Sequence, residues 1–202
     1  MCDPVTAETA APVRVSRPSP TDAALIKASL HDPARFAAVF DRHADEIHRY
    51  AAGRLGTDAA DDVTAETFLT AFRKRGSYDL GRDDARPWLY GIATRWISEH
   101  RRTERRHYDG LARLPVPQQA EAFEEAAANR VVARQMLPLL ARVLATLSQG
   151  ERDLLLLVAW TDLSYAEVAQ ALGIAPGTVA SRLHRVRGKV RRLLGDQESS
   201  PS

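Results

Sequence analysis

The sequence predicts an all-α protein with two small helical domains joined by a flexible linker. Apolar residues recur at helical spacing through most of the chain, and helix-capping signals precede these periodic segments. The pattern is interrupted at residues 107–131, where Leu-Pro-Val-Pro-Gln-Gln is followed by a run of alanine and glutamate. With 202 residues and a hydrophobic fraction of 45%, the chain is long enough for two helical cores.

Shifts in composition give the predicted domain boundaries. Residues 1–20 are rich in Pro, Ala, Thr and Ser and show no period, which is typical of a disordered extension. The predicted parts are an N-terminal extension at 1–20, a first helical domain at 21–106, a linker at 107–134, a second helical domain at 135–195 and a C-terminal tail at 196–202.

Capping residues mark the first three helices of the first domain. Thr21 and Asp22 cap the first helix, and Asp32 precedes a proline that opens the second. The second ends at Gly56, and the third runs from about residue 59 to 74, with acids in its first turn and bases in its last. The predicted core-facing residues are Phe36, Val39, Phe40, His43, Ile47 and Tyr50 on the second helix and Ala65, Phe68, Leu69 and Phe72 on the third.

A loop and a basic helix complete the first domain. Residues 76–86 contain two glycines and no helical period, so they predict a loop of functional length, after which Pro87 starts a fourth helix. Its polar, basic face predicts a nucleic-acid contact, although a core helix whose tryptophans simply pack is an open alternative. The packed side is Leu89, Ile92, Ala93, Trp96 and His100, and the polar side is Thr94, Arg95, Ser98, Arg101 and Arg102.

The second domain begins with two predicted helices. The first covers residues 135–147 and bears Pro138 near its start. Ser148 and Glu151 then form a capping box, in which the serine hydroxyl accepts a backbone N–H and the glutamate reaches back to the serine amide. This capping box opens a very apolar helix.

A helix-turn-helix is predicted at the end of the second domain. Ser164 and Glu167 form another capping box, and the helix that they open carries an apolar stripe. Gly173 stands where a helix usually ends in a left-handed residue, and Pro176 can open the next helix. The apolar stripe is Tyr165, Val168, Ala169 and Leu172.

The helix that follows Pro176 has one packing face and one cationic face. No acid occurs between residues 176 and 194, so partners within the helix cannot neutralise the cationic face, and phosphate is its natural counter-charge. An ordinary amphipathic surface helix is the alternative, but the capped helix and sharp turn before it favour DNA binding. The packing residues are Val179, Leu183, Val186, Val190 and Leu193; the opposite side carries Ser181, Arg182, Arg185, Lys189 and Arg192.

The residue inventory argues against an enzyme and against a metal or cofactor site. Cys2 is the only cysteine, and the six histidines show no His-x-x-x-His pairing. Nucleophile elbows and phosphate loops are not found. Asp61, Asp62 and Glu66 could hold Mg²⁺ in principle, but dipole pairing in the first turn or a protein contact explains them more simply.

Charge and hydropathy point to a cytoplasmic protein with a nucleic-acid partner. The formal net charge is only +2, yet bases gather at residues 101–106 and 182–192 while acids gather at 58–62 and 121–125. We find no transmembrane span and no secretory signal, so membrane insertion is not expected.

Five short motifs together resemble the sigma-70 family, specifically its two-domain extracytoplasmic-function (ECF) group. They are Ala-Asp-Asp-Val-Thr-Ala-Glu-Thr-Phe at 60–68, Arg-Pro-Trp-Leu-Tyr-Gly-Ile-Ala at 86–93, Leu-Ser-Gln-Gly-Glu-Arg at 147–152, Leu-Ser-Tyr-Ala-Glu-Val-Ala at 163–169 and Gly-Thr-Val-Ala-Ser-Arg-Leu-His-Arg at 177–185. The resemblance covers about residues 22–194, and the order and spacing of the motifs are more specific than the helix-turn-helix alone. The chain departs from the usual pattern at Ala65, Arg95 and Ala180, where the family usually has Gln, Asn and often a basic residue.

The resemblance implies an alternative sigma factor that directs core RNA polymerase to specific promoters and assists promoter melting. It implies contacts with the clamp and flap regions of polymerase, a flipped base held near the loop at 76–86, a linker that threads toward the RNA exit path and an anti-sigma factor as a further partner. The implied minus-ten contacts are Ser77, Tyr78, Trp88, Thr94, Arg95, Ser98, Arg101 and Arg102; the implied minus-thirty-five contacts are Thr178, Ser181, Arg182, His184, Arg185 and Lys189; the implied polymerase contacts are Asp61, Asp62, Glu66 and Phe68.

Two other functions remain open at this point. A stand-alone helix-turn-helix regulator would bind an operator as a dimer, but no coiled-coil heptads supply its interface. An anti-sigma or adaptor protein would bind polymerase without reading DNA, and it leaves the cationic helix unexplained. A test of whether DNA binding requires core polymerase distinguishes the sigma factor, the stand-alone regulator and the adaptor protein.

Overall fold

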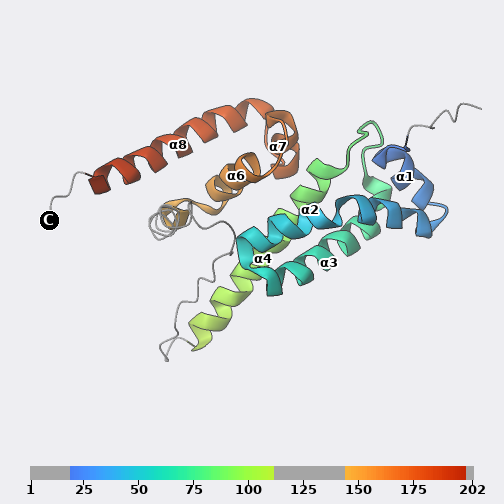
Figure 1. The fold of residues 1–202 in the computed structure, drawn as a ribbon, viewed down its shortest axis with the longest axis horizontal. Helices are drawn as coiled ribbons and strands as arrows, with labels where there is room; N and C mark the ends of the chain where they lie inside the picture. The colour runs from blue at the N-terminus through green and yellow to red at the C-terminus, as the bar shows by residue number, and fades with distance from the viewer. Residues whose placement is uncertain (1–18, 112–143, 199–202) are drawn as a thin grey trace, which may run out of the picture.

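The computed structural model describes residues 19–111 and 144–198, and these residues form helices and connecting segments without any strand. The predicted all-α fold is therefore confirmed. Figure 1 shows one group formed by α1 to α4 and a second group formed by α6, α7 and α8, with α8 extending away from the rest toward the C-terminus. Residues 112–134 of the predicted linker and most of the helix at 135–147 lie outside the described residues; residues 107–111 and 144–146 are helical.

The N-terminal caps form as predicted. The Thr21 hydroxyl accepts the Ala24 N–H at 3.3 Å at the start of α1 (Asp22–Ser29). The Asp32 carboxylate accepts the Ala34 N–H at 3.3 Å and starts η1 (Pro33–Phe36), a 3-10 turn that leads into α2.

α2 (Ala37–Leu55) and α3 (Thr57–Lys74) form a hairpin whose apex is Gly56. Gly56 has φ 87°, a backbone conformation that favours glycine, so the predicted end of α2 is confirmed. The predicted core stripes are wrong in part. Phe40 of α2 is 43% exposed. α3 turns a different face inward, so Leu69 is 41% exposed and Ala65 is exposed as well. The inward residues of α3 are Ala60, Val63, Thr64, Thr67, Phe68 and Ala71.

Two threonines explain how polar residues take core positions on α3. The hydroxyl of Thr64 donates to the Ala60 carbonyl at 2.7 Å, and that of Thr67 donates to the Val63 carbonyl at 2.6 Å. Each hydroxyl is thereby satisfied within its own helix, and the methyl group is left to pack.

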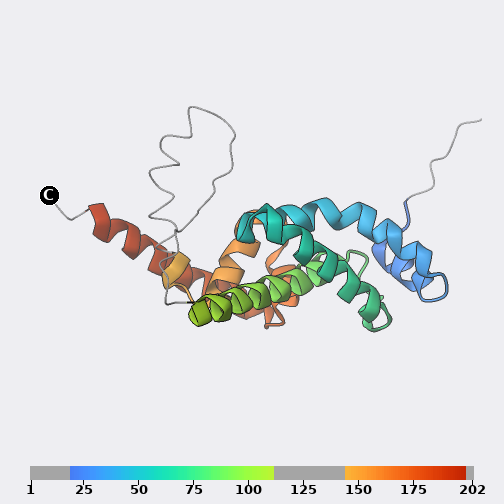
Figure 2. The same ribbon diagram turned by 90° about the horizontal axis from the view of Figure 1, so that it is seen from below.

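The segment after α3 leads through η2 (Arg75–Ser77) and a loop at 78–85 into α4 (Arg86–Leu111). α4 packs on both α3 and α2, and its backbone helix continues to Leu111, beyond the domain end at residue 106 that the sequence predicts. Figure 2 shows α4 as a long straight helix along the lower side of the molecule.

Both predicted capping boxes form in the second group. Ser148 opens α6 (Gln149–Trp160) with Glu151, and Ser164 opens α7 (Tyr165–Leu172) with Glu167. Gly173 ends α7 at φ 64°, ψ 36°, and Pro176 is the first residue of α8 (Pro176–Glu198), so the helix-turn-helix is confirmed. Tyr165, placed in the apolar stripe of α7, is instead 44% exposed; the buried residues of α7 are Val168, Ala169 and Ala171.

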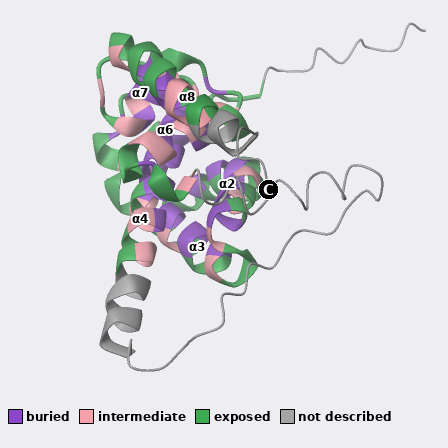
Figure 3. Cartoon of the chain, turned by 90° about the vertical axis from the view of Figure 1, so that its left-hand side faces the viewer, coloured by how far each residue is buried: buried purple, intermediate pink, exposed green. Residues whose placement is uncertain are grey.

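The two groups are packed against each other. Their buried residues belong to one hydrophobic core, which Figure 3 shows as buried segments running from α3 and α4 through α6 to α7. α4 and α7 approach so closely that a Cβ at Gly91 would lie 2.6 Å from the Ala171 carbonyl oxygen. The Arg54 guanidinium of α2 forms a buried ion pair with the Asp153 carboxylate of α6.

Candidate nucleic-acid interface

The second helix of the helix-turn-helix, α8, has the two faces that the sequence predicts. Val179, Leu183 and Val186 are at most 2% exposed and pack inward. The predicted contact residues Ser181, Arg182, His184 and Arg185 are exposed, and Thr178 is half-buried near the start of the helix. A cationic surface on the second helix of such a motif has the geometry of a helix that enters a DNA major groove.

Lys189 differs from the other predicted contacts on α8. Its ammonium donates to the Glu151 carboxylate at the start of α6. The Lys189 hydrogen bond, together with those from the Ser148 backbone and side chain, lowers the pKa of Glu151 to about 2. Lys189 therefore ties α8 to α6 in this structure.

The predicted nucleic-acid face of α4 is only partly exposed. Arg95 and Arg102 are exposed, and Arg102 lies 3.1 Å from the Glu99 carboxylate. Thr94, predicted on this face, is 5% exposed and lies 3.0 Å from the Tyr50 hydroxyl inside the core. The placement of Thr94 on the polar side is thus wrong, because a partner from α2 satisfies its hydroxyl.

The remaining polar residues of this face contact other helices. Ser98 accepts a hydrogen bond of 3.0 Å from the Gln149 side chain, and Arg101 donates to the Arg54 carbonyl at 2.7 Å. Gln149 also reaches Asp153 of its own helix, at 3.1 Å. These bonds join α4, α2 and α6 along the edge of the predicted minus-ten surface.

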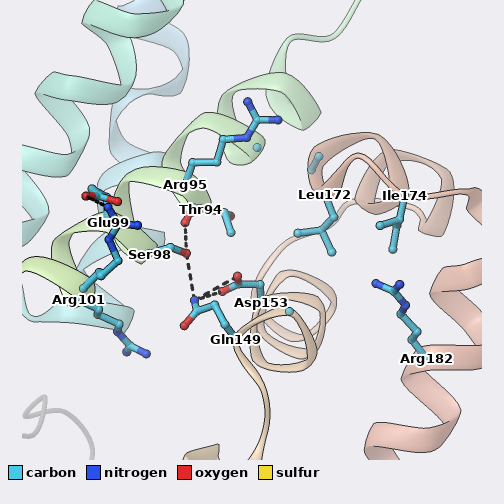
Figure 4. A pocket seen from close by; sticks show the side chains of 14 residues that line it. Thr94, Arg95, Ser98, Glu99, Arg101, Gln149, Asp153, Leu172, Ile174 and Arg182 are labelled. Carbon is cyan, nitrogen blue, oxygen red and sulfur yellow. Dashed lines mark hydrogen bonds and ion pairs between the residues drawn. The ribbon is translucent and has the colours of Figure 1, made fainter. Parts of the chain in front are cut away.

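A cavity of about 570 Å³ separates the two predicted DNA-binding helices. α4 lines one wall, the start of α6 and the turn after α7 line others, and Arg182 of α8 closes the far side (Figure 4). Arg95 and Arg101 extend in opposite directions from α4 in this view. The two helices therefore both contribute to the lining of one cavity.

The loop at 78–85 is closed by a buried tyrosine. The Tyr78 hydroxyl donates toward the Arg82 and Asp84 carbonyls, at 2.7 and 3.1 Å, and its ring lies 5.0 Å from that of Trp88. Burial raises the pKa of Tyr78 to about 12, so the phenol keeps its proton at neutral pH. Tyr78 shapes the loop from inside, whereas Ser77 is exposed and donates to the Lys74 carbonyl at 2.8 Å.

A buried charged cluster connects α1 and α2 with this loop. Asp22 is 3% exposed and accepts hydrogen bonds from His43 at 2.7 Å and from the Ala85 N–H at 2.9 Å. His43 also contacts Glu46 at 2.7 Å. Burial alone would lower the pKa of His43, but its hydrogen bonds to the two carboxylates raise it to about 9.

We expect the free energy of unfolding to fall as the pH rises through about 9. The pKa of folded His43 lies above its unfolded value of 6.5, so this stabilisation is fully present below pH 6.5 and is lost as the folded group deprotonates. Its size is on the order of 3 kcal/mol, at about 1.4 kcal/mol per pKa unit. Denaturant unfolding between about pH 6 and pH 10 measures it. An equal fall in the His43→Gln variant contradicts the assignment.

The same cluster is the metal-ligand candidate found among the described residues, and its chemistry does not favour a metal. Ligand atoms of Asp22, His43 and Asp84 lie within 4.8 Å of one another. A metal ion requires neutral imidazole, whereas both ring nitrogens of His43 face carboxylates that hold the proton on the ring. The ion pair explains the cluster without a metal.

The predicted polymerase contacts on α3 are split between surface and core. Asp61 and Asp62 are exposed and Glu66 is half-buried, but Phe68 is 4% exposed and packs edge to face on Phe40 at 4.9 Å. The exposed apolar side chains of this region are Phe40 and Leu69, which the sequence assigned to the core. Phe40 and Leu69 are apolar residues beyond those that one core-facing helical stripe needs, and this surplus could have indicated an exposed apolar surface.

The fold and the two basic surfaces define a helical DNA-binding factor of two packed units. Two family models match the chain, sigma-70 region 2 over residues 39–107 and sigma-70 region 4 over residues 137–190. The ECF RNA polymerase sigma factor SigL of Mycobacterium tuberculosis is 34% identical over 174 residues, which cover 85% of this chain and 89% of SigL. SigW of Bacillus subtilis is 28% identical over 172 residues, 82% of this chain and 91% of SigW.

Solved structures show the same fold. CnrH, in complex with the cytosolic domain of CnrY, matches with a TM-score of 0.56 and 26% identity over 89% of this chain and 99% of CnrH. The sigma factor RpoE from Bartonella quintana, in complex with the anti-sigma factor NepR, has a TM-score of 0.58 and 22% identity over 79% of this chain and 96% of its own.

The chain belongs to the sigma-70 family, in its ECF group. It is an alternative sigma factor that directs RNA polymerase to promoters, as the resemblance implies. In the described parts of the chain, no helix is long and apolar enough to cross a membrane.

Proposed function

We propose that α8 reads the minus-thirty-five element and that α4 with the loop at 78–85 reads the minus-ten element. The observation that carries this proposal is the row of exposed polar and basic side chains on α8, Ser181, Arg182, His184 and Arg185, opposite a fully buried apolar face. Such a helix can discriminate all four base pairs in a major groove, while arginine can also bind phosphate.

On the minus-ten side, Arg95 and Arg102 are the proposed DNA contacts of α4. Both are exposed and lie on one side of the helix, while Trp88 lies at its start beside the loop. Melting exposes bases that can stack on aromatic rings or meet polar groups, and cations hold the backbone. Ser77 and Arg101 are proposed as further contacts, and Ser98 as one that becomes available after the two groups separate. Thr94 and Tyr78 support this surface from within.

The packed arrangement is proposed to be a form that does not span a promoter. The two elements are named for positions about 25 base pairs apart, which is about 85 Å of B-DNA at about 3.4 Å per base pair. α4 and α8 instead face one cavity of about 570 Å³. Separation of the two groups would free Ser98 from Gln149 and move α8 away from α4.

The polymerase-facing surface is proposed to lie on α2 and α3. Asp62, Glu66 and Leu69 follow one another at helical spacing on the outer side of α3, and Phe40 adds an exposed ring from α2. An apolar patch rimmed by acids fits a partner with a complementary basic, apolar surface, such as the polymerase clamp. Asp61 lies 3.0 Å from His48 and belongs to the rim.

An anti-sigma partner is the proposed source of regulation. The similar CnrH structure contains a second protein, and the sequence resemblance implies that factors of this group are held inactive by such partners. A partner that favours the packed form over the separated form would lower promoter binding by population shift alone. The proposed role is non-enzymatic and cytoplasmic and needs no cofactor.

Reversal of charge at Asp62 and Glu66 is expected to weaken binding to core polymerase. Asp62 is exposed and Glu66 is half-buried, and neither belongs to the core, so the double variant Asp62→Lys, Glu66→Lys should keep its unfolding midpoint while losing favourable charge complementarity. Fluorescence titration with core polymerase at several salt concentrations measures the effect. Asp162→Lys, at an exposed acid in the second group, is the matched control; equal loss in both variants contradicts the surface.

Removal of Arg182 or Arg185 is expected to weaken promoter binding. The loss is about 1–3 kcal/mol and depends on sequence if the contact is to a base edge, and it is uniform across sequences if the contact is to phosphate. Holoenzyme binding to promoter DNA of varied sequence and salt separates the two. Arg187→Ala, an exposed arginine elsewhere on α8, is the control.

A stand-alone operator-binding regulator is the second candidate. It would bind DNA without polymerase and would do so as a symmetric dimer. DNA binding by the chain alone, with no new transcription when core polymerase is added, would favour it.

A further inference from the structure

An aspartate at the start of α1 both donates a hydrogen bond to the end of the proposed minus-ten loop and accepts one from it. The Asp22 N–H donates to the Asp83 carbonyl at 3.0 Å, and the Asp22 carboxylate accepts the Ala85 N–H at 2.9 Å. Ala85 is fully buried, and its carbonyl accepts the first helical bond of α4 from Leu89 at 2.9 Å. Asp22 thus fixes the point where the loop ends and α4 begins.

His43 and Arg42 of α2 hold the Asp22 side chain in place. His43 Nε2 lies 2.7 Å from one carboxylate oxygen, and the Arg42 guanidinium donates to the other. Glu46 holds the second ring nitrogen of His43 at 2.7 Å. Asp22, His43 and Arg42 each have at least two hydrogen-bond partners, so the loop end is coupled to α2 through charge-assisted hydrogen bonds.

Neither residue can touch DNA directly in this fold. Asp22 is 3% exposed and His43 is 5% exposed. The remaining loop residues are ordered from within by the Tyr78 hydroxyl, which reaches the Arg82 and Asp84 carbonyls. Two residues therefore fix the loop: Tyr78 holds its two ends together, and Asp22 sets its position relative to α1 and α2.

We propose that Asp22 and His43 are positioning residues for minus-ten recognition, because they place the loop at 78–85 and the first turn of α4 where an unstacked base is bound. This inference rests on the proposed function of that loop. A buried acid that holds a backbone amide can fix a binding loop to within a few tenths of an ångström, and recognition of a flipped base depends on such placement.

The test uses holoenzyme made from the full chain and core polymerase. Wild-type holoenzyme first selects a minus-ten sequence from a pool of forked DNA with randomised single-stranded bases. Asp22→Asn and His43→Gln are then compared with wild type for discrimination between the selected sequence and its single-base variants. We expect discrimination to fall about tenfold, which is the effect of losing one hydrogen bond to a charged group. Binding to minus-thirty-five duplex and the affinity for core polymerase should stay unchanged.

Two further variants keep the result decisive. Asp32, like Asp22, accepts hydrogen bonds from a backbone amide and from an arginine, but it caps only η1. Asp32→Asn should therefore leave discrimination between minus-ten sequences unchanged. Tyr78→Phe removes only the hydroxyl that closes the loop, and it should reduce discrimination in the same direction even if Asp22→Asn does not fold.

Four outcomes would overturn the inference. Unchanged discrimination in Asp22→Asn, or an equal loss of binding at both promoter elements, assigns these residues a purely structural role. A wild-type holoenzyme that selects no minus-ten sequence removes the proposed function of the loop and this inference together. Selection by the wild type with no effect in any loop-anchoring variant overturns the inference alone.

Discussion

Replacement of Asp153 by alanine should separate the two helical groups. Asp153 and Arg54 form an ion pair between α6 and α2 in which the side chains are 8% and 0% exposed. Loss of the carboxylate leaves the guanidinium buried without its counter-charge, which costs about 3–5 kcal/mol in the packed form. Separation lets water solvate Arg54, so the packed form loses more stability than the open one.

Small-angle X-ray scattering measures this separation as an increase in the radius of gyration. The control is the double variant Arg54→Met, Asp153→Leu, which replaces the pair by apolar side chains and should restore packing. It also removes the Arg54 Nε, which has no hydrogen-bond partner in the described part of the chain. An unchanged radius in Asp153→Ala would show that the ion pair does not hold the groups together.

Gly91→Ala should also separate the two helical groups, in this case by a steric clash between α4 and α7. The new Cβ would lie 2.6 Å from the Ala171 carbonyl oxygen and 3.3 Å from its carbonyl carbon and Cα, and backbone atoms of α7 cannot rotate aside. Alanine also favours the helix by about 1 kcal/mol over glycine, so α4 itself should become more stable. We therefore expect separated groups with an intact α4 and a higher apparent affinity of holoenzyme for promoter DNA, because a larger fraction is competent to bind.

Gly188→Ala provides the matched control for this variant. Gly188 lies within α8, and a Cβ there meets no atom within 4 Å. It should raise helix stability without separating the groups. Hydrogen exchange of the amides of α4 and α7, together with promoter titration, distinguishes the two variants; equal exchange rates in Gly91→Ala and wild type would contradict the close contact as a barrier to separation.

Local chemistry explains why the helix ends could be predicted from the sequence. The capping boxes at Ser148 and Ser164, the Asp32 cap and the turn at Gly173 each depend on residues within four positions of one another. Their geometry follows from short-range hydrogen bonds that do not depend on the tertiary fold. The packing face of α8 was equally predictable because a single uninterrupted period runs through it.

Long-range contacts explain where the sequence was insufficient. Helical period alone cannot say which of two adjacent apolar stripes faces a neighbour, and so Phe40 and Leu69 were assigned to the core. Thr94 is buried because Tyr50 supplies a partner from another helix. Lys189 finds Glu151 on another helix, and the packing of α4 on α7 joins segments far apart in the chain.

The central claim is that α8 and α4 read two separate promoter elements for core polymerase. The most direct measurement is in-vitro transcription from a library of randomised promoters, with core polymerase and either wild type, Arg182→Ala or Arg95→Ala. The account predicts discrete start sites that share two upstream motifs, with Arg182→Ala relaxing the distal motif and Arg95→Ala relaxing the proximal one. Start sites that share a single motif, or variants that alter neither motif, would contradict it.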